Sequence, residues 1–245
     1  MMKKNLIIVN HVGTSVLETV KSELMVLVDS IKRRQPESEV VLAFSSDRAR
    51  RKVASNGINV MSIQRAIEWG IELGFAHISI LPLHVVGGLD YRNLSAQVQV
   101  LGDRIDLKGP LLASSMSLSD VAQTIKKTLS SDDLDKTIIL IGHGTEDSTN
   151  HLYNDLEDQL KKKGLKAKVR TLTTEFDDIV DTIDGQEVVL YPLFTVSGYH
   201  VKKDVFDGED SISHRLSNLG YEVSAYKHGL LAFDEIREIY LNKLN

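Results

Sequence analysis

Residues Thr137–Thr145 read TIILIGHGT, an apolar run that stops at Gly142-His143-Gly144-Thr145. A continuous apolar run closed by glycine is typical of a strand buried on both faces of a parallel sheet. A side chain placed directly after such a strand lies where open α/β sheets bind ligands. His143 is therefore a candidate functional residue. Considered as an isolated tripeptide, His143-Gly144-Thr145 allows an alternative, in which the histidine caps the next helix or packs in a loop.

On both sides of this stretch, strand patterns alternate with amphipathic helices and short loops. Such alternation predicts right-handed βαβ units and parallel sheets, an α/β fold. Thr14 or Ser15 is expected to cap the first helix, and Ser62 the helix that runs through Leu73. Further strands are expected at 6–9, 39–44, 77–81, 104–107, 167–172, 187–191 and 222–225, and later helices at 119–129, 149–163, 175–183, 211–218 and 233–244.

An internal repeat organises the chain. The segments ILPLHVVGGLD (80–90) and LYPLFTVSGYH (190–200) share Pro-Leu and a later glycine at an offset of 110 residues, and Asp90 corresponds to His200. Residues 6–14 resemble 138–145, and 108–113 resemble 227–232. We therefore expect two similar lobes, 1–131 and 132–245, each a parallel sheet flanked by helices, with a ligand cleft between them. The C-terminal helix is free to pack back on the first lobe.

Composition limits the classes of function. Hydrophobic residues at 42% and charged residues at 26% of 245 are ordinary for a globular protein with a sizeable core. The chain has no cysteine, which leaves His, Asp and Glu as its strong metal ligands. A net charge of −5 argues against nucleic-acid binding. The first apolar run of the chain is too short for a signal sequence or a membrane span, so we expect a cytoplasmic protein without a membrane partner.

The two lobes are expected to bring histidines and a carboxylate to one cleft. His143 and His200 come from the second lobe, and His11, His84 and Asp90 from the first. Two imidazoles and a carboxylate with an open position suit a borderline divalent transition metal better than Mg²⁺ or Ca²⁺, which prefer oxygen ligands.

Four motifs carry a resemblance to a known family. They are HVGTS at 11–15, the loop from Leu83 to Tyr91, IGHGTE at 141–146 and PLFTVSGYHVKKD at 192–204. With these motifs the chain resembles the class II tetrapyrrole chelatases, specifically the anaerobic-type sirohydrochlorin cobaltochelatases. The resemblance implies insertion of Co²⁺, the substrate metal, into sirohydrochlorin for cobalamin biosynthesis, without ATP and without an organic cofactor.

The resemblance also implies roles for single residues. His143 matches the family's metal ligand and proton acceptor, and His200 its second metal-binding histidine. Asp90 falls where close relatives have a glutamate ligand, one methylene longer. His11 and His84 are accessory candidates.

The proposed macrocycle carries carboxylates, so groups that bind anions are expected near the metal. Helix N-termini after Gly13 and Gly144 would offer backbone N–H groups and a positive dipole end at Thr14, Ser15 and Thr145. Lys202 is a further candidate for substrate binding, with a solvated surface charge as the alternative.

Two other functions stay open on the residues alone. One is a chelatase that acts on another metal or ring, such as Fe²⁺ or Ni²⁺. The other is a non-catalytic carrier of a tetrapyrrole or metal, which would need no proton acceptor beside the ion. The sequence leaves open whether copies of the chain associate into a homo-oligomer.

Overall fold

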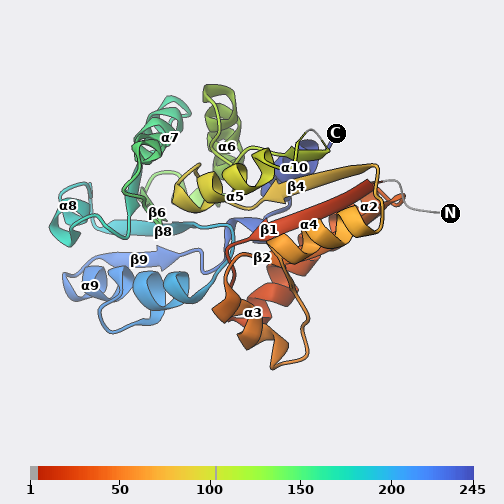
Figure 1. The fold of residues 1–245 in the computed structure, drawn as a ribbon. Coiled ribbons are helices and arrows are strands. Elements are labelled where there is room, and N and C mark those ends of the chain that lie inside the picture. The colour runs from red at the N-terminus through yellow and green to blue at the C-terminus, as the bar shows by residue number, and fades with distance from the viewer. Residues whose placement is uncertain (1–4, 103) are drawn as a thin grey trace. The chain divides into compact units, whose positions relative to one another are not determined.

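The computed structural model describes residues 5–102 and 104–245 (Figure 1). Their contacts divide the chain into two compact units. Unit 1 extends to Leu111 and takes in Arg237–Asn245 as well, and unit 2 is Leu112–Ile236. Each unit contains one parallel sheet with helices, so the predicted class of two α/β lobes is confirmed.

Unit 1 holds a five-stranded sheet in the order β3-β2-β1-β4-β5, and every strand pair is parallel. Its strands are β1 (Asn5–His11), β2 (Ser38–Phe44), β3 (Met61–Ser62), β4 (His77–Pro82) and β5 (Ile105–Leu107). Its helices are α1 (Leu17–Thr19), the π-helical η1 (Val20–Leu24), α2 (Met25–Arg34), α3 (Asp47–Ala54), α4 (Ile63–Glu72) and α5 (Leu89–Gln99).

Unit 2 holds a four-stranded parallel sheet in the order β7-β6-β8-β9. Its strands are β6 (Thr137–Gly142), β7 (Ala167–Thr171), β8 (Glu187–Leu193) and β9 (Glu222–Ala225). Its helices are α6 (Ser115–Thr128), α7 (His151–Lys162), α8 (Phe176–Val180), the π-helical η4 (Val201–Asp207) and α9 (Ile212–Asn218), with short 3₁₀ turns η2 (Ser131–Asp133), η3 (Ser148–Asn150) and η5 (Leu230–Ala232). Helix α10 (Asp234–Asn242) begins in unit 2 and ends in unit 1.

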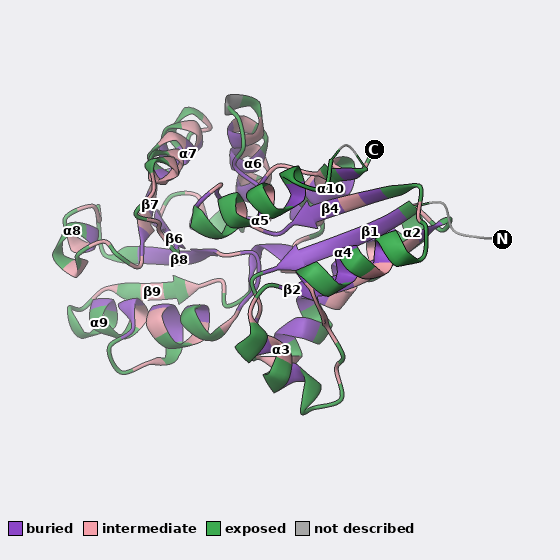
Figure 2. Ribbon diagram, viewed as in Figure 1, coloured by how far each residue is buried: buried purple, intermediate pink, exposed green. Residues whose placement is uncertain are grey.

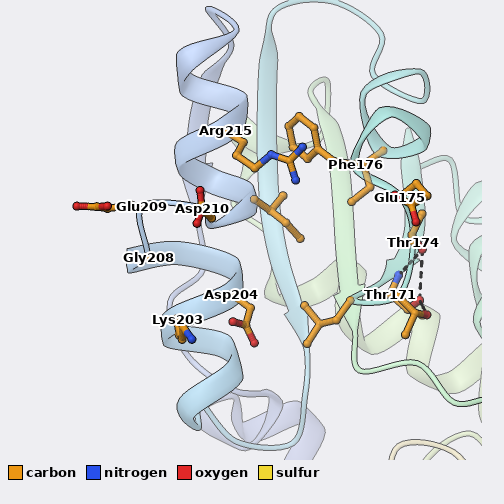
Figure 3. A pocket seen from close by; sticks show the side chains of 14 residues that line it. Thr171, Thr174, Glu175, Phe176, Lys203, Asp204, Gly208, Glu209, Asp210 and Arg215 are labelled. Carbon is orange, nitrogen blue, oxygen red and sulfur yellow. Dashed lines mark hydrogen bonds between the residues drawn. The ribbon is translucent and has the colours of Figure 1, made fainter.

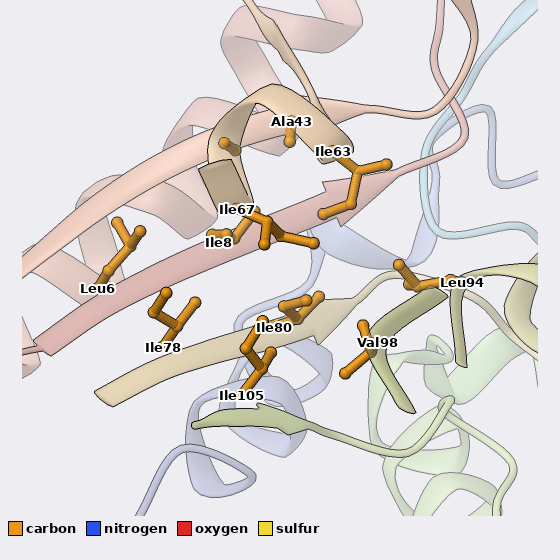
Figure 4. Close-up of a cluster of buried hydrophobic side chains, with 11 residues drawn as sticks. Leu6, Ile8, Ala43, Ile63, Ile67, Ile78, Ile80, Leu94, Val98 and Ile105 are labelled. Atoms are coloured by element: carbon orange, nitrogen blue, oxygen red, sulfur yellow. The ribbon is translucent and has the colours of Figure 1, made fainter. Parts of the chain in front are cut away.

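The central strands are buried on both faces, as their apolar runs predict (Figure 2). In unit 1 one face of the sheet packs against α4 and α5 (Figure 4). The side chains of that cluster are Leu6, Ile8, Ala43, Ile63, Ala66, Ile67, Ile78, Ile80, Leu94, Val98 and Ile105. The corresponding face in unit 2 packs against α8, α9 and η4. Alternate side chains of each strand thus serve two helical layers.

The internal repeat is a real structural duplication. The order β2-β1-β4-β5 in unit 1 matches β7-β6-β8-β9 in unit 2. Backbone contacts match as well: the N–H of Leu111 donates to the His84 carbonyl, and the N–H of Leu230 donates to the Phe194 carbonyl, both at 2.8 Å. His84 and Phe194 therefore occupy equivalent places, 110 residues apart as the sequence repeat indicates.

The division between the units differs from the expected boundary after Ser131. Helix α6 belongs to unit 2 because it packs on α7. The Lys126 Nζ donates to the Lys163 carbonyl at 2.5 Å, and the hydroxyls of Thr128 and Tyr191 lie 2.8 Å apart. At the other end of the chain, the Arg34 guanidinium pairs with Glu238 at 2.7 Å, which ties the C-terminal part of α10 to unit 1.

Two helix starts differ from the prediction. Thr14 and Ser15 do not cap the first helix, which begins at Leu17; the Thr14 hydroxyl accepts instead from the Val16 N–H, at 3.2 Å. Helix α6 begins four residues early, because Ser114 forms a capping box with Ser117. Ser62 does cap α4, by accepting from the Arg65 N–H. Over the described part of the chain, no helix is both long and apolar enough to cross a bilayer.

Candidate metal centre

Unit 2 places two of the predicted metal ligands, His143 and His200, close together. His143 is the first residue after β6, and His200 lies in the helical turn that leads into η4, beyond the end of β8. Gly142 pairs with Leu193 in the sheet, so both loops leave the same carboxyl edge. Both histidines are exposed, and their ring centroids lie 5.5 Å apart at an interplanar angle of 85°. The structure thus brings together the two histidines that the sequence singled out.

In both rings Nδ1 faces an acceptor on the protein. In His143 it lies 3.1 Å from the Gly144 carbonyl, and in His200 it lies 2.6 Å from the Asp204 carboxylate. An acceptor at Nδ1 favours the neutral form that carries its proton there, which leaves the lone pair on Nε2. Nε2 is the nitrogen that each ring offers to an ion or a proton.

The spacing of the rings suits a shared ion. With a metal–nitrogen distance of about 2.0–2.1 Å, the centroid of a coordinating imidazole lies roughly 3.2 Å from the metal. Two rings on one ion therefore have centroids no more than about 6.4 Å apart, and the observed 5.5 Å falls inside that limit. Within either unit, the described residues form no group of three or more His, Asp or Glu side chains able to hold a metal. An ion bound by these two histidines would keep its remaining coordination positions open to other ligands.

Unit 1 carries the other candidates, at the carboxyl ends of β1 and β4. Asp90 is exposed in the first turn of α5, the place that His200 occupies in the repeat. His84 packs edge-on against Tyr91, with centroids 5.9 Å apart, and both its ring nitrogens are buried without a hydrogen-bond partner. Burial lowers the pKa of His84, and the Asp90 charge partly offsets this.

His11 differs from His143 in position and environment. It is the last residue of β1 and pairs with Phe44, whereas the β6 residue in the same position is Gly142. The one-residue slip in the sequence repeat is therefore real. The His11 Nδ1 accepts from the Gly13 N–H at 2.8 Å, and burial, together with the neighbouring His84, lowers its pKa to about 3. His11 is a buried neutral group that supports the loop after β1.

This burial predicts a pH-dependent stability. Because the folded pKa of His11 lies below the unfolded value of about 6.5, its stabilising contribution is complete above pH 6.5 and declines as the pH falls toward 3. We expect the wild type to lose roughly 1.4 kcal/mol more than His11→Gln between pH 7.5 and 5.5. Urea unfolding of both proteins at these two pH values measures the difference. Parallel losses would contradict a buried neutral His11.

The structure refines the candidates for substrate binding. The Thr14 side chain is buried, and Ser15 is exposed. The Thr145 N–H, expected to be open, already donates to the Asn150 side chain at 3.2 Å, and α7 begins only at His151. Lys202 is half-buried and already engaged within the chain. Of these candidates Ser15 has the most accessible side chain.

A cavity of about 550 Å³ lies in unit 2, and Asp204, the partner of His200, is one of the residues that line it (Figure 3). Lys203 and Asp204 of η4 line one wall, and Arg215 stacks on the Phe176 ring at 3.6 Å on another. Asp204 therefore contacts both the cavity and His200. Asp204 is not among the residues predicted for the site, although its spacing of four residues from His200 in HVKKD is a visible signal.

Two solved chelatase structures share this architecture. SirB from Bacillus subtilis with Fe³⁺ superposes with a TM-score of 0.64 at 15% identity, over 98% of this chain and 94% of that chain. The sirohydrochlorin chelatase SirB from Bacillus subtilis subspecies spizizenii, in complex with cobalt, gives 0.62 at 14% identity, over 99% and 94%. The chain has the two-lobed chelatase fold.

Sequence comparison identifies the family. The chain is 25% identical to the sirohydrochlorin cobaltochelatase of Salmonella typhimurium over 254 residues, which cover 100% of this chain and 96% of the relative. The family model for cobalt chelatase (CbiK) matches residues 4–245. The chain belongs to the cobalt chelatase (CbiK) family, and the resemblance inferred from its motifs is confirmed.

Proposed function

We propose that this protein is a sirohydrochlorin cobaltochelatase, an enzyme that inserts Co²⁺ into sirohydrochlorin without ATP on the route to cobalamin. The observation that carries the proposal is the exposed pair of His143 and His200, with Nδ1 of both rings turned to the protein. Family membership over the full chain supports the same reaction.

The reaction exchanges a metal ion for two protons. Co²⁺ enters the ring, and two pyrrole nitrogens each release a proton. The Nε2 lone pairs of His143 and His200 first hold the ion with replaceable bonds. As Co²⁺ moves to the ring nitrogens, these lone pairs become free, and an unperturbed imidazole accepts a proton near neutral pH. His143 accepts one of the two protons and the other passes to water, and both histidines are metal ligands.

Asp90 is the carboxylate of the centre. Its place in the repeat equals that of His200, and its side chain is exposed at the start of α5. As a third ligand it would add negative charge beside a divalent ion, and two imidazoles with one carboxylate suit a borderline divalent transition metal without selecting cobalt. His84, which feels the Asp90 charge, and His11 are accessory residues.

Polar and basic side chains in the segments after β1, β6 and β8 bind the carboxylates of the macrocycle. Ser15 offers an exposed hydroxyl, and Thr14 and Thr145 shape the turns that carry the site. Lys202 contributes positive charge. Lys203, next to it, is exposed, and its contact with Tyr199 raises the pKa of its amine, so it stays charged at neutral pH.

A direct assay tests the proposal. The purified chain is mixed with sirohydrochlorin and Co²⁺, and the absorbance change on metallation is followed against a reaction without protein. We expect Co²⁺ insertion to proceed much faster than the spontaneous reaction. Parallel reactions with Fe²⁺ and Ni²⁺ compare the other metals. A higher rate with one of them would reassign the substrate metal, and no acceleration with any ion would refute the enzyme. Binding of sirohydrochlorin without acceleration would instead indicate a carrier.

A further inference from the structure

The side chain of Asp204 is directed at the back of His200. Its Oδ2 lies 2.6 Å from the His200 Nδ1, the only nitrogen of this ring for which the described structure gives a partner. The two residues are four positions apart: His200 directly precedes η4, and Asp204 lies within it. This distance is short for a nitrogen–oxygen hydrogen bond, as expected when the acceptor is ionised.

The backbone of η4 fixes the place of this carboxylate. Val201 and Val205 are fully buried on the core side, so the segment cannot rotate without exposing them. Its end closes with a π-type turn in which the Gly208 N–H donates to the Lys203 carbonyl at 3.1 Å. A Cβ on Gly208 would lie 2.4 Å from that carbonyl oxygen, so the turn requires glycine. π-helical turns of this kind recur at functional sites.

Asp204 differs from the other carboxylate of the same segment. Its side chain is 35% exposed, and Figure 3 shows it directed into the cavity next to Lys203. The Asp207 side chain is 57% exposed and pairs with Lys227 at 3.1 Å. Asp204 is thus the more shielded carboxylate, and shielding strengthens a charge-assisted hydrogen bond.

We propose that Asp204 is a positioning residue for the metal centre. By accepting the Nδ1 proton of His200, it fixes the ring orientation and keeps the lone pair on Nε2, where the ion binds. Histidine ligands commonly donate their second N–H to a carboxylate, and removal of that partner costs about 10- to 100-fold in metal affinity. The inference rests on the proposed function, because it takes His200 as a metal ligand.

The first test uses the wild-type chain without metal. Nitrogen-15 spectra of its histidine rings, recorded at pH about 8 where an ordinary imidazole is neutral, report which nitrogen carries the proton. We expect the Nδ1–H tautomer for His200, and a shift toward Nε2–H in Asp204→Asn. A wild-type His200 that is mainly Nε2–H would overturn the proposal before any variant is made.

The second test measures binding of Co²⁺ alone by calorimetry. We expect Asp204→Asn to bind about 10- to 100-fold more weakly than the wild type, and Asp204→Glu to recover part of the loss. Asp207→Asn is the matched control and should stay within about twofold of the wild type. Wild-type affinity in folded Asp204→Asn would refute the positioning role.

Neither test needs the tetrapyrrole, so the proposed reaction and the positioning role of Asp204 can be refuted independently. If the assay with sirohydrochlorin shows no acceleration while the tautomer and the Co²⁺ affinity respond to Asp204, the reaction is wrong and the positioning role stands. If metal insertion is accelerated but Asp204→Asn changes neither readout, only the positioning role is wrong.

Discussion

Replacement of His143 by alanine is expected to lower kcat/KM for Co²⁺ insertion by at least about 100-fold, because a positioned proton acceptor contributes about 10²- to 10⁴-fold to a rate. The loss should come without unfolding, since the ring is exposed and its aromatic neighbours are His200 and Phe194, both edge-on. Steady-state kinetics and a thermal melt of the same preparation measure the two effects.

His151→Ala is the matched control for that experiment. His151 is an exposed histidine at the start of α7, where its Nδ1 lies 2.6 Å from the Ser148 carbonyl. Its removal should leave the rate within about twofold of the wild type, a difference of only about 0.4 kcal/mol in the barrier. If His143→Ala behaves like this control, His143 has neither of the roles proposed for it.

Gly13→Ala should destabilise the protein by about 3 kcal/mol or more. Gly13 has φ +134°, a conformation that residues with a side chain rarely adopt, and such strain costs about 1–3 kcal/mol. A Cβ at this position would lie 2.5 Å from the Cβ of Ala49, and overpacking of that kind adds about 1–3 kcal/mol. Denaturant unfolding measures the change.

Gly57→Ala separates these two causes. Gly57 also has positive φ, +79°, but nothing lies within 4 Å of a Cβ built there. Its replacement should cost only the backbone strain, about 1 kcal/mol. Equal destabilisation by the two variants would show that the loop after β1 moves away from α3 easily, and that its close approach is unimportant to stability.

The duplication places side chains of different chemistry at equivalent positions of the two units. The loops after β4 and β8 have the same backbone contacts, yet Asp90 in one corresponds to His200 in the other. The loops after β1 and β6 diverge by one position, which buries His11 within unit 1 and leaves His143 exposed. Equivalent backbone positions in the two units thus carry side chains of different chemistry.

Much of this protein can be predicted from local sequence. Apolar runs specify buried parallel strands, because a strand covered by helices on both faces has no polar side. The repeat offset of 110 residues identifies the duplication, and the motifs at His143 and His200 identify the family. These features can be predicted because each depends on residues close together in the chain or on a pattern that recurs.

The tertiary structure alone decides burial, pairing and the limits of the units. Helix α6 joins unit 2 through contacts with α7 and Tyr191, which are distant in sequence. The buried ring of His11 and the occupied N–H of Thr145 likewise follow from packing around them. Asp204 became a candidate only when the turn into η4 placed its carboxylate on the His200 ring. Such contacts depend on which surfaces meet when the chain folds; the spacing of four residues permits the bond between Asp204 and His200, but the spacing alone does not form it.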